Sequence, residues 1–241
     1  MKTALLSRSV LAGLLVLFCN AAPAFAQQPP MPPKPTTDVS KLMAGEYVLD
    51  KTHANVIFKI NHLGFSTYYG RFNALDAKLN LDTKQPEKSS VEVTVDVSSV
   101  DTNNAKLQDE LKGEKYFNVA KFPAATFKST KITRNGDKGT IDGDFTMLGV
   151  TKPITLNVVF HGGGKSPFGN SQRLGFDATT TIKRAEWGLN ALEPLVGDDV
   201  QLEIETEFTA EPPAAPATPV VPAKDEVKKK VEPNREEKYL E

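Results

Sequence analysis

The chain has 241 residues, enough for one domain with long tails or for two small domains. Its 29 basic and 30 acidic residues give a formal net charge of -1, so the overall charge favours neither nucleic acid nor an anionic membrane as a partner. One cysteine and three histidines exclude a disulfide framework, an iron–sulfur cluster and a cysteine-ligated zinc site.

The first 26 residues have the pattern of an export signal. Lys2 and Arg8 form a basic start, residues 10–18 form a short apolar run, and Ala24-Phe25-Ala26 supplies a small-x-small cleavage pattern. The apolar run is far shorter than the ~20 residues needed to cross a bilayer. Phe18, rather than a small residue, precedes Cys19, which argues against a lipid anchor on that cysteine. We therefore expect export, with cleavage after Ala26.

Two compositionally biased segments flank a compact domain. Residues 27–44 are rich in proline and poor in apolar residues, which favours an extended linker. Residues 211–241 repeat proline and alanine and then alternate charges, which is typical of a disordered tail. Binding of this tail to a partner stays open as an alternative. One folded domain over residues 45–210 is expected between them.

That domain is a series of segments in which apolar and polar residues alternate, as in strands with one dry and one wet face. In chain order, alternation is weak at 47–50, clear at 56–60, 75–81 and 91–97, weak at 125–132, and clear at 141–147, 154–160, 174–182 and 200–208. Asn135-Gly136-Asp137 and Gly162-Gly163-Gly164 have the composition of turns between neighbouring strands.

Only residues 104–112 have a helical pattern, with Leu107 and Leu111 four apart and Gly113 as a stop. Eight or nine half-apolar strands with short turns predict an all-β protein, either a sandwich or a closed antiparallel barrel. Closure removes exposed sheet edges and therefore favours the up-and-down barrel. Such a barrel is either packed solid or holds one small ligand, and periodicity does not choose between the two.

Catalytic motifs are not visible in the sequence. Gly164-Lys165-Ser166 resembles the end of a phosphate-binding loop, but Val159 stands where that loop requires glycine. We interpret His53, His62 and His161 as hydrogen-bonded structural residues rather than metal ligands, and no serine has a nucleophile-elbow context. The aromatic residues fit either ordinary core packing or an apolar ligand cavity.

Several short motifs, spread over the whole expected domain, resemble those of the YceI-like polyisoprenoid-binding family. They are Tyr47-x-Leu49-Asp50-x-x-His53, His62-Leu63-Gly64-Phe65 with Gly70-x-Phe72, Ser98-Ser99-Val100-Asp101-Thr102, Tyr116-Phe117-x-x-x-x-Phe122-Pro123, Gly143-Asp144-Phe145-Thr146 with Gly149, Arg184-x-x-Trp187-Gly188 and Gly197-Asp198-Asp199-Val200. Ala54 and Asn118 depart from the residues that are common in that family at their positions, which affects local hydrogen bonds only.

The resemblance implies a lipocalin-like closed barrel of about eight strands with one or two short helices, located in the periplasm. It implies a lumen that holds an extended isoprenoid or another long-chain lipid, without catalysis, cofactor or metal. The expected partners are this lipid and, transiently, a membrane surface. The residues expected to bind the ligand are Phe58, His62, Phe65, Tyr69, Phe72, Phe117, Phe122, Phe127, Phe145, Met147, Phe176, Arg184 and Trp187.

Arg184, Arg71 and Lys59 are candidates to face a phosphate or quinone head group at the mouth of the lumen. Two other functions stay open. The same lumen would suit a stress-related scavenger of hydrophobic compounds. An enzyme acting on a lipid head group is disfavoured, because the sequence shows no convergent set of nucleophile, base and metal ligands.

Overall fold

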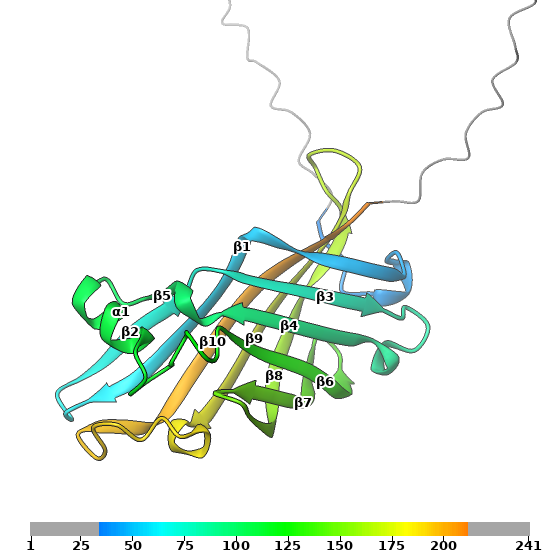
Figure 1. Ribbon diagram of the computed structural model, residues 1–241. Coiled ribbons are helices and arrows are strands. Elements are labelled where there is room, and N and C mark those ends of the chain that lie inside the picture. The colour runs from blue at the N-terminus through cyan, green and yellow to red at the C-terminus, as the bar shows by residue number, and fades with distance from the viewer. Residues whose placement is uncertain (1–33, 212–241) are drawn as a thin grey trace, which may run out of the picture. The chain divides into compact units, whose positions relative to one another are not determined.

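The computed structural model describes residues 34–211, and antiparallel strands make up most of this part of the chain (Figure 1). The predicted signal peptide, residues 1–26, and nearly all of the predicted tail, residues 211–241, lie outside the described residues. These two predictions therefore stay predictions.

Within residues 34–211, ten strands, one α-helix and four short 3-10 helices follow one another. The strands are β1 (Gly45–His62), β2 (Ser66–Phe72), β3 (Leu75–Leu81), β4 (Ser90–Asp96), β5 (Val100–Asp101), β6 (Ala124–Asn135), β7 (Lys138–Met147), β8 (Val150–Lys165), β9 (Gln172–Lys183) and β10 (Val196–Ala210). The helices are η1 (Val39–Lys41), η2 (Pro86–Lys88), η3 (Val97–Ser99), α1 (Ala105–Lys112) and η4 (Arg184–Trp187).

Pairing between β1 and β10 closes the sheet into a barrel. Eight antiparallel strands form the closed ring, in the order β1, β3, β4, β6, β7, β8, β9 and β10. The closing register sets Val56 opposite Ile204 and Phe58 opposite Leu202. β2 continues along the second half of β1, and the short β5 pairs with β2. The predicted lipocalin-like closed barrel of about eight strands with few helices is confirmed.

The alternation in the sequence places one face of each strand inside the barrel. In β3, every odd-numbered residue from Leu75 to Leu81 is buried and every even-numbered residue is exposed. Strand residues point to opposite faces in turn, so this pattern sends the leucines inward and Asp76, Lys78 and Asn80 into solvent. In each alternating strand, the apolar set of every second residue thus identifies the side chains that line the interior.

β2 is the one long strand that the alternation does not show, because its inward-facing position next to Phe72 is a glycine. A Cβ atom added to Gly70 would lie 2.2 Å from the Phe58 ring. The side chain of Phe58, on the neighbouring strand β1, fills the space over Gly70. The apolar surface at this position of β2 therefore comes from β1. The two separate segments expected at 47–50 and 56–60 form one 18-residue strand, β1, with an irregular register between Leu49 and Ala54.

The prediction of a turn at Gly162-Gly163-Gly164 is wrong, because these glycines lie within β8. The chain turns at residues 166–171 instead, where the Ser166 amide donates to the Ser171 carbonyl at 2.8 Å. Gly162 has a φ of +121° next to a register shift in β8. A Cβ there would lie 2.9 Å from Pro35 of the N-terminal segment, so the glycine permits a close approach rather than a reversal.

The packed domain begins before residue 45. Thr36 pairs with Gly163, and Val39, the first residue of η1, and Leu42, directly after η1, are buried in the core. The proline content of residues 27–44 concealed these two apolar anchors.

The predicted helix is confirmed as α1. The Asn104 side chain caps its start by accepting a hydrogen bond from the Leu107 amide at 3.2 Å, and the helix ends at Gly113. None of the helices within residues 34–211 has the length and hydrophobicity to cross a membrane.

Candidate functional site

The inward faces of the barrel strands enclose a cavity of about 370 Å³. This volume lies within the range of small-molecule binding pockets, roughly 300 to 1,000 Å³. The lining is almost wholly aliphatic and aromatic, with a few polar side chains such as Thr126, Thr206 and His62. Within residues 34–211, every buried side-chain nitrogen and oxygen has a hydrogen-bond partner. An apolar molecule can therefore occupy the cavity without competing for an unsatisfied polar group.

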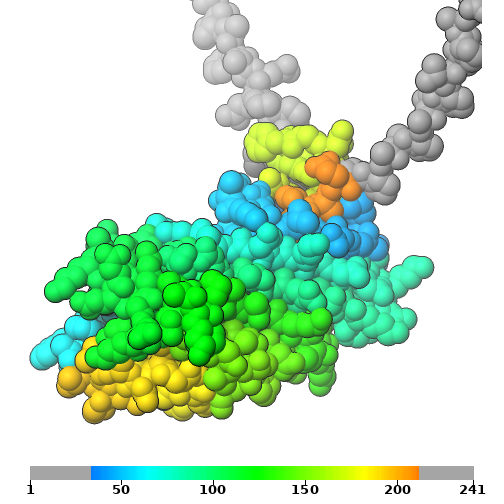
Figure 2. Space-filling view, viewed as in Figure 1, coloured from blue at the N-terminus to red at the C-terminus, as the bar shows by residue number. Residues whose placement is uncertain are grey.

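One end of the cavity reaches the molecular surface. Leu192, in the loop between η4 and β10, lines the cavity and is still 50% exposed. Leu107 and Leu111 of α1 line the same cavity from the opposite side of this end. Figure 2 shows the green segment that contains α1 over this end of the barrel, with the yellow loop that precedes β10 beneath it. We call this end the mouth.

At its opposite end this cavity is closed off by side chains. Tyr47 is fully buried, Leu174 is 1% exposed, and both pack with Val39 and Leu42 around η1. The Tyr47 hydroxyl donates to the Met43 carbonyl at 2.8 Å. Burial raises the pKa of Tyr47 above its ordinary value, because the charged phenolate would lose its water there. The cavity thus has one open end and one plugged end.

Aromatic rings form a continuous path from the mouth into the barrel. Phe117, in the segment after α1, packs edge-on against Phe72 with ring centroids 5.7 Å apart. Phe72 in turn lies 5.8 Å from Phe58 of β1. Such pairs combine large apolar area with few rotatable bonds. They give the cavity a stiff wall on this side.

Most of the residues predicted to bind a ligand line this cavity. They are Phe58, His62, Phe72, Phe117, Phe127, Phe145, Met147, Phe176 and Arg184. These residues come from five strands, the loop after α1 and the helix η4, and closure of the barrel brings them together. Their contact with a ligand stays a prediction.

The other four predicted residues lie outside the lining. Phe65 is 91% exposed in the β1–β2 hairpin, and Tyr69 faces outward on β2 with the Lys59 ammonium 5.5 Å from its ring centroid. Phe122 packs against Gly149 outside the cavity. Trp187 is 3% exposed and packs edge-on behind Phe145, with ring centroids 5.4 Å apart. Trp187 therefore supports the cavity wall from behind.

The sequence did not indicate the residues of the mouth loop. Ala191 and Leu192 line the cavity from a segment without secondary structure, where no periodicity marks an inward face. Leu107 and Leu111 carried a signal, since their spacing of four predicts one apolar helix face. The sequence would therefore have supported the prediction that this apolar face of the helix packs against one end of the barrel.

The three cations considered for a head group are all engaged elsewhere. Arg184 is 7% exposed, and its guanidinium donates to the carbonyls of Gly197 at 2.8 Å, Val196 at 3.0 Å and Leu189. Lys59 pairs with Glu203, and Arg71 pairs with Asp101 at 3.2 Å. Each partner is a fixed protein group. These hydrogen bonds let Arg184 hold the mouth loop, and its contact with a ligand head group stays a prediction.

One group of potential metal ligands lies on the outer face of the barrel. Oxygen and nitrogen atoms of Asp50, His53 and Glu207 lie within 4.8 Å of one another. The Arg173 guanidinium forms an ion pair with Glu207 and lies 3.0 Å from Asp50. The positive charge next to these two carboxylates is therefore already supplied by the protein. The Thr52 hydroxyl, and to a lesser extent the Thr52 amide and His53, hold the pKa of Asp50 well below its ordinary value. The cluster is an ion-paired turn.

Comparison with known proteins agrees with this geometry. Residues 47–208 match the YceI-like domain family. A UPF0312 protein of Pseudomonas paraeruginosa is 40% identical over 167 residues, which cover 68% of this chain and 87% of that protein. The crystal structure of a Campylobacter jejuni YceI protein is 30% identical, with a TM-score of 0.55 over 68% of this chain and 97% of that one.

A structure described as a polyisoprenoid binding domain from Saccharophagus degradans shares the fold. It has a TM-score of 0.50 at 17% identity and covers 70% of this chain and 99% of that one. Residues 47–208, which match the family, take in the whole cavity lining and all eight strands of the closed barrel except the first two residues of β1 and the last two of β10. The chain therefore belongs to the YceI-like family.

Proposed function

We propose that this protein is a non-catalytic binding protein that holds a polyisoprenoid or a similar long-chain lipid in the barrel lumen. The observation that carries the proposal is the apolar cavity of about 370 Å³, open at the mouth and plugged at the other end. The likeness to a polyisoprenoid binding domain of known structure supports the same class of ligand.

The energetics of apolar transfer suit a carrier that uses no nucleotide. Each buried CH₂ group is worth roughly 0.8 kcal/mol relative to water, so a long chain does not travel free through an aqueous compartment. The same chain gains little when it moves from a bilayer into an apolar lumen, because both surroundings exclude water. Uptake and release therefore run close to equilibrium.

The polar head of such a lipid would sit at the mouth, outside the apolar lining. His62 and Tyr68 line this end, with ring centroids 5.9 Å apart, and the Tyr68 hydroxyl donates to the Thr102 carbonyl at 3.2 Å. Since Arg184, Lys59 and Arg71 are paired within the protein, selection for a charged head is weak in this proposal. Chain shape and length then dominate the affinity.

Transient contact with a membrane at the mouth is part of the proposal. Phe65 is 91% exposed, Leu63 44%, Leu192 50% and Leu195 58%, and these residues sit on two loops joined by a hydrogen bond from the Leu63 amide to the Leu195 carbonyl at 2.9 Å. Exposed aromatic and aliphatic tips of this kind favour the interfacial region of a bilayer. A lipid would pass between bilayer and lumen without crossing open water.

Periplasmic location is a further part of the proposal, and the basic start, short apolar run and Ala24-Phe25-Ala26 pattern of the sequence support it. Sequencing of the mature N-terminus tests it. A start at Gln27 is expected, and an intact Met1 on protein from the cytoplasm would contradict export.

A pair of tryptophan substitutions on β9 tests lipid binding. Ala178 lines the cavity, whereas its neighbour Thr179 is exposed on the outer face. Ala178→Trp fills the lumen and should lower the affinity for all-trans prenols at least tenfold, while Thr179→Trp should bind them like the natural protein. Displacement of an environment-sensitive dye measures both, and thermal melting confirms the fold. Equal affinity of the two variants would refute the lumen as the binding site.

A further inference from the structure

A second, smaller cavity of about 100 Å³ lies beyond the main cavity. Its apolar walls are Val39, Leu81, Pro86, Ile132, Phe160 and Leu174, and residues of the β6–β7 hairpin, among them Arg134, Asp137 and Lys138, also line it. Apart from four side chains, the linings of the two cavities do not overlap. The smaller cavity therefore lies at the end of the barrel away from the mouth.

The four shared side chains are Leu79, Ile141, Val158 and Phe176, and they come from β3, β7, β8 and β9. On three of these strands, the inward residue two positions to one side of the shared residue lines the large cavity, and the inward residue two positions to the other side lines the small cavity. On β3, Ala77 lines the large cavity and Leu81 the small one. On β8 and β9, the same change runs from Leu156 to Phe160 and from Ala178 to Leu174. The shared residues therefore mark the boundary between the two cavities on four of the eight barrel strands, and we call them the dividing ring.

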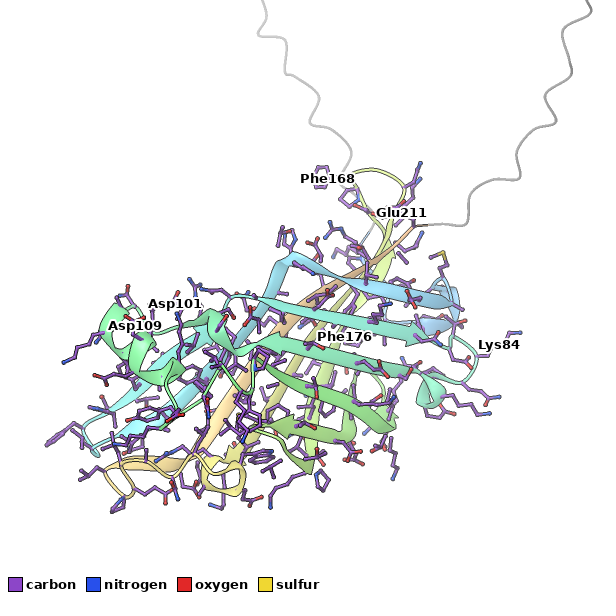
Figure 3. All side chains as sticks on the ribbon, viewed as in Figure 1. Lys84, Asp101, Asp109, Phe168, Phe176 and Glu211 are labelled. Carbon is purple, nitrogen blue, oxygen red and sulfur yellow. The ribbon has the colours of Figure 1, made fainter. Side chains whose placement is uncertain are left out.

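Phe176 is the largest member of the dividing ring and the only aromatic one. Its ring stacks at a tilt on Phe160 of the small cavity, with centroids 4.9 Å apart. It meets Phe208 of the large cavity edge-on, with centroids 6.0 Å apart. Figure 3 labels Phe176 in the middle part of the barrel, away from α1 and the mouth. Phe176 is only half-buried although it points inward, because it borders open space on both sides.

We infer that Phe176 determines the longest chain that the lumen accepts, by separating the small cavity from the large one. In the natural protein the end of the ligand stops at the dividing ring. The small cavity is a second chain-binding compartment that becomes available when Phe176 is removed or swings aside. The surface that its lining exposes to the cavity is mainly apolar, which favours an apolar chain end, although polar residues of the β6–β7 hairpin also border it. This inference rests on the proposed function.

The test measures affinity against chain length. Two series grow stepwise, all-trans prenols by one isoprene unit and straight-chain alcohols by one methylene, and both displace an environment-sensitive dye from the full chain. Affinity should rise roughly fourfold per buried methylene and stop rising at a cut-off length. Phe176→Ala should move the cut-off to longer chains in both series. Phe176→Leu, a milder change, should move it in the same direction, which guards against a folding defect in the alanine variant.

A plug in the small cavity distinguishes a joined compartment from a wider lumen. Leu81 lines only the small cavity. Leu81→Trp alone should leave the cut-off of the natural protein unchanged, whereas Leu81→Trp added to Phe176→Ala should restore the natural cut-off. Thermal melting and circular dichroism identify folded variants before binding is compared.

Two results would overturn the inference while the proposed function stands. One is an unchanged cut-off in both folded Phe176 variants, which would show that other side chains limit the chain. The other is a longer cut-off that Leu81→Trp does not reverse, which would show that the added length lies in the large cavity. If the natural protein binds alcohols but no prenols, the proposed isoprenoid function fails while the alcohol series still tests the dividing ring. Binding of neither series would refute both.

Discussion

Arg184→Met should destabilise the protein strongly while leaving head-group selectivity intact. Arg184 joins the start of η4 to the loop that forms the mouth, through hydrogen bonds to the carbonyls of Leu189, Val196 and Gly197. Methionine retains much of the apolar volume and donates none of these bonds. Three carbonyls then lose a charged donor, and Glu193, 4.0 Å from the guanidinium, loses its nearest cation.

The magnitude follows from burial. Arg184 is 7% exposed, so water does not readily replace the lost donor. A hydrogen bond to a charged group contributes about 1.5 to 3 kcal/mol, and removal of one partner from a buried charged network typically costs about 3 to 5 kcal/mol. We expect a loss of about 3 to 5 kcal/mol in the free energy of unfolding. Arg184→Lys, which keeps the charge but only one donor group, should lose somewhat less.

Urea unfolding measures the loss, and binding of matched lipids measures selectivity. Because the guanidinium is committed to three carbonyls, a prenol and its phosphate should keep their natural affinity ratio in Arg184→Lys, within about twofold. A stability within about 0.5 kcal/mol of the natural protein, together with a selective loss of the phosphate-headed lipid, would refute this reasoning. Arg184 would then be a head-group ligand.

Three further predictions follow from the cavity, the mouth and the ion-paired turn. Phe145→Ala should cost less than the roughly 3 to 5 kcal/mol of a solid core, because Phe145 borders open space, and should change chain-length preference; a full core-sized loss in urea without altered binding would contradict this. Phe65→Ser should weaken co-sedimentation with phosphatidylcholine vesicles, whereas Phe168→Ser, which changes an 86% exposed residue at the opposite end, should not; equal effects would contradict a membrane contact at the mouth. The Thr52 hydroxyl lowers the pKa of Asp50, so Asp50→Asn should cost about 1 kcal/mol in urea unfolding at neutral pH. That difference should shrink as the pH falls below the unfolded-state value of about 4, and a difference independent of pH would contradict it.

Strand periodicity predicted the barrel well where both faces of a strand carry side chains. β3 alternates without a gap, and β10 does so over residues 200–208 with Thr206 as the one polar residue on its inward side, so their inward residues could be named from the sequence. β2 was missed because Gly70 leaves its inward position empty for Phe58, a contact between two strands that one strand's pattern does not contain. The start of the packed domain was misplaced for a similar reason. Val39 and Leu42 pack against residues that are distant in the sequence, and such contacts leave no local pattern.

The site was predictable in its aromatic wall and not in its mouth. Phe58, Phe127, Phe145 and Phe176 follow the parity of their strands, and all four line the cavity. Phe65 shares a motif with His62 but lies on a hairpin tip, where alternation no longer defines an inside. The division of the interior depends on how side chains from four strands meet, which follows from the stagger of the closed barrel rather than from any single segment.

Native mass spectrometry of the full chain, purified without detergent from the organism that makes it, tests the central claim most directly. The account predicts a bound species with the mass of a long-chain apolar lipid, present in Thr179→Trp and lost from Ala178→Trp. Fragmentation of that species distinguishes an isoprenoid from the mixed hydrophobic compounds expected of a scavenger. The bare polypeptide mass in both the natural protein and Thr179→Trp, unchanged after incubation with prenols, would contradict a lipid-binding lumen.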